Sequence, residues 1–190
     1  MIYVVNGFPG SGKTTFEDMV CKIMGEDTFA FKISTIDFVK DVARYCGWDG
    51  AKDLHNRKFL SDLKDLLTQW NDIPYKKIKD SVDEIRADCK DHGLNFEKYA
   101  IFIDCREPWE ISKLCRGLGA KSLLIRRKDD ENTQVSNHAD AQVLDYTYDI
   151  IINNDGDLTD LADKAFTFVD SEHLYKPHKS FQVDYYGQIH

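Results

Sequence analysis

The chain has 190 residues, of which 42% are hydrophobic and 31% are charged, and its formal net charge is −8. This composition excludes a disordered chain, and the acidic balance disfavours a general nucleic-acid binder, which would need a basic surface. The apolar runs are shorter than the roughly 20 residues of a membrane span and no signal peptide is recognised, so we expect a cytoplasmic protein with no membrane partner.

Predicted strands and helices alternate along the chain. An apolar run at residues 2–5 predicts a strand buried on both faces, and a helix at residues 13–24 follows it. The remaining predicted elements are, in chain order, a strand at 29–34, helices ending at 46, at 57–70 and at 74–89, a strand at 99–104, a helix within 107–119, a strand at 121–126, a strand within 148–156 and a helix at 158–169. Ser34 or Thr35 is the expected N-cap of the helix that ends at residue 46.

This alternation predicts parallel βαβ units and an α/β fold. We expect three layers, with a parallel sheet of about five strands and helices on both faces. The five cysteines are dispersed without C-x-x-C spacing, which indicates reduced thiols rather than a disulfide framework or a zinc site.

The stretch GFPGSGKTT, at residues 7–15, satisfies the phosphate-binding-loop (P-loop) pattern G-x-x-x-x-G-K-[ST]. Glycines allow such a loop to bring its N–H groups onto phosphate oxygens, and the following helix adds its own N–H groups. The alternative, a glycine turn with a chance match, is disfavoured by the predicted strand before it and helix after it. We therefore expect ATP to contact the loop residues Gly7, Pro9, Gly10, Ser11, Gly12, Lys13, Thr14 and Thr15.

Four residues have specific expected roles in phosphate transfer. Lys13 supplies a cation to the β- and γ-phosphates, and Thr14 offers a hydroxyl to Mg²⁺. A second acid is needed to order the shell of the metal, and Asp104, at a predicted strand end, is the candidate, acting through water. Arg106 would hold a phosphate or stabilise the transferring charge. The alternatives are that Asp104 caps the next helix and that Arg106 is a surface residue.

Motifs and length narrow the class of nucleotide-binding protein. A signalling GTPase would carry an N-K-x-D guanine motif, which the sequence lacks, and motor or AAA modules are longer. A chain of this length, with a helical segment between its second and third predicted strands, suits a small-molecule kinase of the nucleoside monophosphate kinase type.

The segment KISTIDFVKDVA, at residues 32–43, resembles the I-S-T-G-D segment of adenylate kinases, which lines the phosphate-acceptor site. The resemblance covers Ser34, Thr35 and Asp37 and implies that they bind the acceptor, whereas Ile36 replaces the family glycine. If the acceptor is an alcohol rather than a phosphate, Asp37 is the first candidate for the general base.

The segment FIDCREPWEISKLCRGLGAKSLLIRR resembles bacteriophage deoxynucleoside monophosphate kinases and animal-type phosphomevalonate kinases. In those families the aspartate and arginine of D-x-R belong to the active site, which implies catalytic roles for Asp104 and Arg106. The segment DIIINNDGDLTDL resembles the I-x-N-D-G turn of the same group, and implies that Asn153 and Asn154 lie near the nucleotide base. The P-loop departs from these families, which tend to have S-G-K-D where this chain has S-G-K-T.

The resemblance also implies a division of the chain. Residues 1–170 would form a P-loop kinase domain that contains a helical acceptor-binding insert at about 48–95 and a lid at about 127–145. The tail is rich in His and Tyr and differs in character from the rest of the chain, so residues 171–190 are expected to form a C-terminal extension.

Three further arginines are candidates for binding phosphate. Arg57 lies in a basic pair before an apolar stripe, as in the phage kinases, and would bind the acceptor phosphate; the alternative is a solvated helix start. Arg126 and Arg127 precede the polar loop and would close over the phosphates as catalytic lid residues. For this pair, the alternative is two exposed charges that balance nearby acids.

These observations predict an ATP- and Mg²⁺-dependent phosphotransferase acting on a small phosphorylated acceptor, in the first place a (deoxy)nucleoside monophosphate. The alternatives are a phosphomevalonate kinase and a kinase for a hydroxyl of a modified nucleoside or nucleic acid; the acidic composition makes a nucleic-acid partner unlikely. A further alternative is an ATP-binding regulatory module without transfer activity. We expect a monomer or a homodimer.

Overall fold

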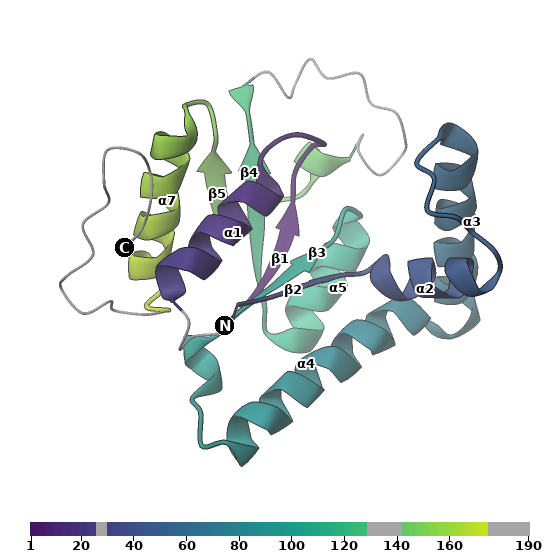
Figure 1. The fold of residues 1–190 in the computed structure, drawn as a ribbon, viewed down its shortest axis with the longest axis horizontal. Coiled ribbons are helices and arrows are strands. Elements are labelled where there is room, and N and C mark those ends of the chain that lie inside the picture. The colour runs from purple at the N-terminus through teal and green to yellow at the C-terminus, as the bar shows by residue number, and fades with distance from the viewer. Residues whose placement is uncertain (26–29, 129–141, 175–190) are drawn as a thin grey trace. The chain divides into compact units, whose positions relative to one another are not determined.

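The computed structural model describes residues 1–25, 30–128 and 142–174 (Figure 1). The chain divides into two compact units. The first, here called the sheet unit, comprises Met1–Lys32 and Asn95–His190, and the second, the helical unit, comprises Ile33–Leu94. The segment predicted as a helical insert, residues 48–95, falls within the helical unit except for its last residue.

A five-stranded sheet with the order β2-β3-β1-β4-β5 forms the framework of the fold. The strands are β1 (Ile2–Asn6), β2 (Ala30–Ser34), β3 (Ala100–Asp104), β4 (Lys121–Arg126) and β5 (Ile150–Asn153). β1 pairs in parallel with β3 and with β4, and β4 pairs in parallel with β5. The predicted α/β fold with a parallel sheet of five strands is thereby confirmed.

β1 lies in the middle of this sheet, and all five of its residues are buried, as the apolar run predicts. At its carboxyl end, Asn6 pairs with Leu124 of β4, and further along β4 Arg126 pairs with Asn153 of β5. Asp104 is the last residue of β3. The carboxyl ends of these strands therefore bring polar side chains to one edge of the sheet, which is the edge where α/β proteins bind ligands.

Helices cover both faces of the sheet. α1 (Lys13–Met24) and α7 (Leu158–Ser171) lie side by side (Figure 1) and share one apolar cluster with alternate strand residues such as Tyr3, Phe102 and Ile125. The intervening strand residues are buried too, and α5 (Pro108–Leu118) contacts β1 and β4. Because successive strand residues point to opposite faces, α5 covers the second face and completes the three predicted layers.

The other described elements of the sheet unit are two 3₁₀ turns, Phe96–Lys98 and Val143–Asp145. α1 and β4 occupy the residues predicted for them, and the remaining strands of the unit differ from prediction mainly at their ends. Among the described helices, none combines the length and the apolar character that crossing a membrane requires.

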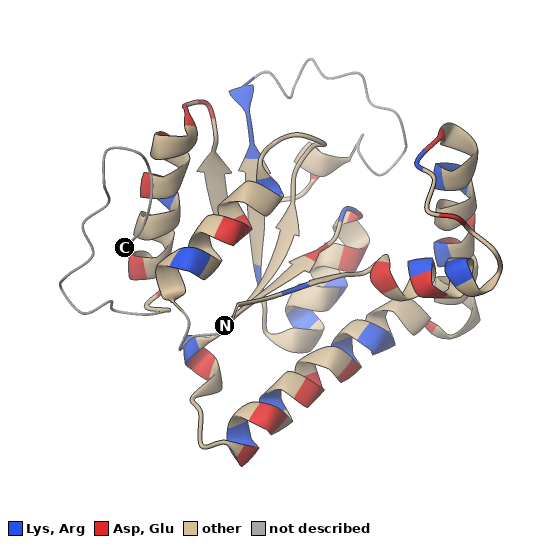
Figure 2. Cartoon of the chain, viewed as in Figure 1, with Lys and Arg blue, Asp and Glu red and all other residues tan. Residues whose placement is uncertain are grey.

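The helical unit contains α2 (Asp37–Tyr45), α3 (Leu54–Asn71) and α4 (Ile73–Asp91). Acidic and basic side chains alternate along α4 (Figure 2), and Asp83 forms ion pairs with Lys79 and Arg86. Exposed pairs of this kind contribute little to stability individually, because water and salt screen them. The charge pattern therefore marks a solvated face of the helix rather than a binding site.

One prediction for the helical unit is wrong. Ile36 occupies the N-cap position of α2 and makes no side-chain cap; instead the carboxylate of Asp37 accepts the N–H of Ser34 at 2.9 Å. The apolar stripe predicted the helix α3 correctly, and its residues Leu66 and Trp70 are 62% and 80% exposed. An apolar period identifies a helix, but it does not specify which element covers that face.

Candidate active site

The predicted P-loop connects β1 to α1 at the carboxyl edge of the sheet. Gly7 and Gly12 have φ angles of 151° and 98°. A Cβ atom on Gly7 would lie 2.1 Å from the carbonyl oxygen of Ile125, and one on Gly12 would lie 2.4 Å from the side-chain nitrogen of Asn154. Both glycines of the sequence pattern are therefore required by close packing of the loop against the end of β4 and against Asn154.

The first turn of α1 has the properties of an anion-binding site. Its N-cap residue, Gly12, makes no side-chain cap, and the turn carries no acidic residue. The first N–H groups of a helix have no partners within the helix, and the positive end of the helix dipole attracts anions. Thr14 and Thr15 are exposed on this turn, as are Pro9 and Gly10 on the loop, so the turn is open to a ligand.

Lys13 lies on the loop itself. Its Nζ donates hydrogen bonds to the carbonyl oxygens of Gly7 and Phe8, at 2.7 and 3.0 Å. The ammonium group is thereby held against the first two residues of the loop. A cation in this position can bind the terminal phosphates of a nucleotide as a point charge.

Asn154 is a buried residue that is hydrogen-bonded to the P-loop. It is 4% exposed, its Nδ2 donates to the carbonyl oxygen of Ser11 at 2.9 Å, and its backbone N–H donates to the carbonyl oxygen of Arg126 at 2.7 Å. These contacts give Asn154 a structural role toward the P-loop that the sequence pattern does not reveal. Whether it also lies near a nucleotide base stays a prediction.

Arg126 and Asn153 are the last residues of β4 and β5, and Arg127 follows directly after Arg126. Arg126 donates from its Nε to Oδ1 of Asn153 at 2.8 Å, and the carbonyl oxygen of Asn153 accepts a hydrogen bond from Lys164 at 2.6 Å. Arg127 is exposed. Most of the predicted lid, residues 129–141, lies outside the described residues, as does most of the predicted C-terminal extension.

Asp104 and Arg106 are connected to the P-loop through Asn6, a residue that the sequence analysis missed. The Nδ2 of Asn6 donates to the carbonyl oxygen of Arg106 at 3.1 Å and to the hydroxyl of Tyr148 at 2.7 Å, and its Oδ1 accepts the N–H of Gly7 at 2.8 Å. One buried amide therefore fixes the D-x-R segment against the first glycine of the loop. A polar residue at the end of an otherwise apolar buried strand is the signal that could have identified it.

Glu17, on the second turn of α1, is a second residue that the sequence analysis missed. Its side chain is 2% exposed, and among the described residues its Oε1 has no hydrogen-bond partner. Its pKa is raised to about 7, mainly by burial and also by the carboxylate of Asp104, while Lys32 and Lys13 oppose the shift. A helical wheel could have placed Glu17 on the buried face of α1, which also carries Phe16, Val20 and Met24.

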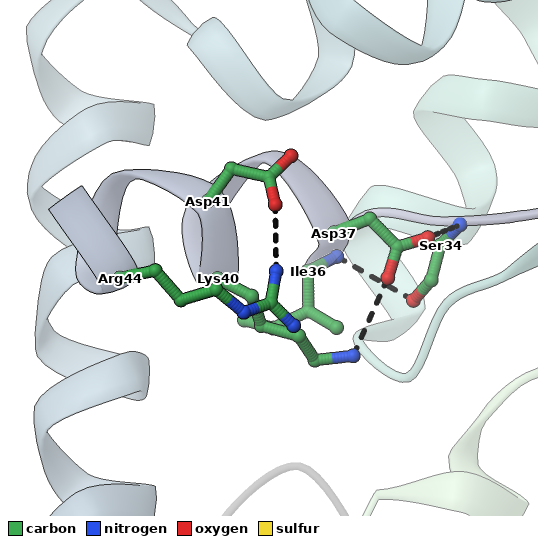
Figure 3. Close-up of polar contacts among 6 residues, drawn as sticks. All are labelled: Ser34, Ile36, Asp37, Lys40, Asp41 and Arg44. Atoms are coloured by element: carbon green, nitrogen blue, oxygen red, sulfur yellow. Dashed lines mark hydrogen bonds and ion pairs between the residues drawn. The ribbon is translucent and has the colours of Figure 1, made fainter. Parts of the chain in front are cut away.

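The acceptor candidates Ser34 and Asp37 bond to each other and to their own neighbours in the helical unit (Figure 3). Asp37 accepts the N–H of Ser34 through one carboxylate oxygen and pairs with Lys40 through the other, at 2.9 and 3.3 Å. The hydroxyl of Ser34 accepts the N–H of Ile36 at 3.5 Å. This local network orders the turn between β2 and α2.

The remaining acceptor candidates lie elsewhere in the helical unit. Thr35 is 4% exposed, and its hydroxyl accepts a hydrogen bond from Lys64 of α3 at 3.2 Å. Arg57 is exposed on the first turn of α3, and its Nε donates to the carbonyl oxygen of Lys52 at 2.9 Å. Thr35 is therefore built into the packing of the unit, whereas the guanidinium of Arg57 extends toward solvent.

Oxygen groups at the P-loop are the side chains available to a metal ion. Thr14 supplies an exposed hydroxyl, and Asp104 supplies a carboxylate at the end of β3. Within the described part of the chain, no group of three or more His, Cys, Asp or Glu side chains could hold a metal ion alone. A hard cation at this site would therefore share its coordination shell with water or phosphate oxygens, as Mg²⁺ prefers.

No model of a known protein family matches the chain, and no curated protein matches its sequence. Among solved structures, the shikimate kinase of Aquifex aeolicus matches with a TM-score of 0.51 at 11% identity, over 92% of this chain and 99% of that chain. The APS kinase of Mycobacterium tuberculosis matches with a TM-score of 0.42 at 11% identity, over 89% of this chain and 96% of that chain.

The dephospho-CoA kinase of Campylobacter jejuni matches with a TM-score of 0.43 at 15% identity, over 90% of this chain and 96% of that chain. Because the last two TM-scores are low, the fold assignment rests on the first structure. At this identity the likeness shows the fold alone. The chain has an α/β fold with the sheet order 2-3-1-4-5, similar to the fold of this shikimate kinase.

Proposed function

We propose that the chain is an ATP-dependent kinase of a small molecule. The observation that carries this proposal is the P-loop, whose pattern residues are folded at the carboxyl edge of the sheet with the Nζ of Lys13 on the carbonyl oxygens of Gly7 and Phe8. The fold similarity to a shikimate kinase supports the same conclusion. Thr14, Thr15, Gly10 and the other loop residues would bind the phosphates of ATP.

Mg²⁺ fits the oxygen groups of this site. The hydroxyl of Thr14 and the carboxylate of Asp104 would hold it, the latter through water, in addition to the phosphates. When bound, the ion neutralises charge on the phosphoryl oxygens. Lys13, Arg106, Arg126 and Arg127 would add positive charge, and catalysis would consist mainly of positioning and charge stabilisation.

We propose further that the acceptor already carries a phosphate, and that it is a (deoxy)nucleoside monophosphate. Ser34, Thr35, Asp37, Arg57 and Arg106 are the proposed acceptor-binding residues. Both carboxylate oxygens of Asp37 already accept hydrogen bonds, which makes it a poor general base. A phosphate acceptor needs no strong base, because its own oxygen is the nucleophile.

We also propose a cytoplasmic location. All five cysteines are free thiols, which suits a reducing compartment.

The test is an ADP-release screen over the eight common nucleoside and deoxynucleoside monophosphates, with phosphomevalonate as the competing acceptor. ADP release that depends on one nucleotide supports the proposal, and release that depends on phosphomevalonate replaces its acceptor. ATP binding without any acceptor-dependent release would instead favour a regulatory module. Asp37→Asn should keep most of the activity with a phosphate acceptor, whereas a collapse of the rate would indicate a hydroxyl acceptor.

A further inference from the structure

Glu17 is a buried acidic residue on α1, and acidic side chains are rarely buried unless they are paired. It lies on α1 four residues after Lys13 and three after Thr14, so all three side chains project from neighbouring turns on one side of the helix. Helical side chains lean toward the N-terminus of their helix, which directs Glu17 toward the turn that carries Thr14. Its burial is nearly complete, at 2% exposure.

The carboxyl group of Glu17 lacks the partners that such burial normally demands. Among the described residues, no hydrogen-bond donor reaches its Oε1. A buried carboxylate costs free energy unless it is paired, and such sites are usually neutralised, bonded or metal-bound. The oxygen is therefore a ligand atom for which the described residues supply no partner.

The charges around Glu17 identify the kind of partner. Strand alternation places Asp104 on the face of β3 that carries Ala100 and Phe102, and this face packs against α1 in the cluster that includes Phe16 and Val20. Asp104 and Glu17 therefore both lie between the sheet and α1, and the carboxylate of Asp104 acts to raise the pKa of Glu17. Lys13 and Lys32 act to lower the pKa of Glu17. However, Lys13 donates hydrogen bonds to carbonyl oxygens of the loop, and Lys32 is paired with Asp18. Two acids that converge beside a hydroxyl favour a divalent cation with oxygen ligands.

We propose that Glu17 is a second carboxylate of the Mg²⁺ site, acting together with Asp104 and Thr14. This inference rests on the proposed function, because the cation would arrive with the nucleotide. Glu17 would contribute to the affinity for the metal rather than to the affinity for the nucleotide. In the rival account Glu17 is a neutral glutamic acid that only fills space on the buried face of α1. Glutamine at this position would then leave the affinity for the metal unchanged.

Calorimetry with β,γ-imido-ATP separates the two accounts. The affinity for β,γ-imido-ATP is measured with excess Mg²⁺ and again with EDTA. For each chain, wild type or Glu17→Gln, the ratio of the affinity in Mg²⁺ to the affinity in EDTA gives the Mg²⁺ enhancement. We expect Glu17→Gln to lower this enhancement about 10-fold or more, the usual effect of losing a group that supports a metal site. Affinity in EDTA should stay the same or rise, because a negative charge near the triphosphate has been removed.

Mn²⁺ provides a second readout that does not depend on activity. The free Mn²⁺ signal in electron paramagnetic resonance, recorded with β,γ-imido-ATP present, should show weaker Mn²⁺ binding to Glu17→Gln than to the wild-type chain. Asp163→Asn is the control, because it removes one carboxylate from an exposed position on α7, the helix beside α1. This control should keep the wild-type enhancement within about twofold.

The outcomes are distinct. Full Mg²⁺ enhancement in a folded Glu17→Gln variant overturns the inference and leaves the proposed function intact. Failure of the wild-type chain to bind β,γ-imido-ATP under either condition overturns both. If Glu17→Gln does not fold, Glu17→Asp replaces it: this variant keeps the charge but withdraws the carboxylate by one methylene, and an unchanged Mg²⁺ enhancement would again overturn the inference.

Discussion

The candidate residues of the sheet unit and those of the helical unit are held in different ways. In the sheet unit, Asn6 and Asn154 connect the P-loop to residues more than 90 positions away along the chain, such as Arg106. In the helical unit, Asp37 and Arg57 bond to residues within five positions of themselves. The first arrangement is a preorganised site. In the helical unit Thr35 is also held by a distant residue, Lys64, whereas Asp37 and Arg57 are side chains that a ligand must still bring together.

The strongest test of this difference is Lys13→Ala in the sheet unit. The substitution removes the cation on the loop without touching the core, so the chain should fold normally. We expect the transfer rate to fall by about 10²–10³-fold, as when one stabilising group of a transition state is lost. Steady-state ADP release measures the rate, and an unchanged rate would remove the P-loop from the mechanism.

Gly12→Ala tests whether the loop depends on close packing. The new Cβ would lie 2.4 Å from the side chain of Asn154, and the φ angle of 98° is unfavourable for alanine. We expect a loss of about 3 kcal/mol in unfolding free energy, because strain and overpacking add. Urea unfolding measures this loss of unfolding free energy. Gly10→Ala is the control, since its φ is also positive but its Cβ would meet nothing within 4 Å; equal losses would contradict the packing argument.

The pH dependence of stability tests the environment of Glu17. Burial raises its pKa from 4.5 to about 7, so between these values the folded chain holds more protons than the unfolded chain. The contribution of Glu17 to stability is therefore present below pH 4.5 and is lost as the pH rises through about 7, by at most about 3 kcal/mol. Glu17→Gln should remove this decline, which urea unfolding at pH 5 and pH 8 would detect. The same decline in both chains would show that Glu17 is not buried.

Asn154→Ala tests the support beneath the loop. It leaves the carbonyl oxygen of Ser11 without its hydrogen bond, so we expect a loss of about 1–2 kcal/mol in unfolding free energy and weaker ATP binding. Asn153→Ala removes an exposed amide of the same turn and should cost less. Thermal unfolding and calorimetry compare the two variants, and a larger loss for Asn153→Ala would reverse the assignment.

Arg57→Ala has the smallest expected effect on stability, within about 0.5 kcal/mol, because the side chain is exposed. If Arg57 binds the acceptor phosphate, KM for the acceptor should rise about tenfold while KM for ATP stays constant, since a charge-assisted hydrogen bond is lost. Lys58→Ala, the neighbouring cation of the same helix, is the control. Equal effects of the two substitutions would indicate general electrostatic attraction rather than a specific contact.

Local signals predicted much of the sheet unit. The apolar run of β1, the glycine pattern and the alternation of strands with helices each depend on neighbouring residues, and the structure confirms the α/β fold that they predict. The contact of Asn154 with Ser11 was missed because it depends on packing between elements distant in sequence. A helical wheel could have placed Glu17 on the buried face of α1, but the face of the sheet that this helix covers is not encoded locally. The helical unit shows the same limit, since the stripe of α3 predicted the helix but not the exposure of Trp70.

The sequence by itself determined where the strands and helices lie and which loop carries a phosphate-binding pattern, because periodicity, glycine and capping chemistry act over a few residues. Only the tertiary structure decided which polar groups meet at the carboxyl edge of the sheet. Strand order and register place Asn6, Asp104 and Asn153 there, and the packing of α1 buries Glu17 near Asp104. These positions depend on contacts between distant segments, which no local pattern encodes.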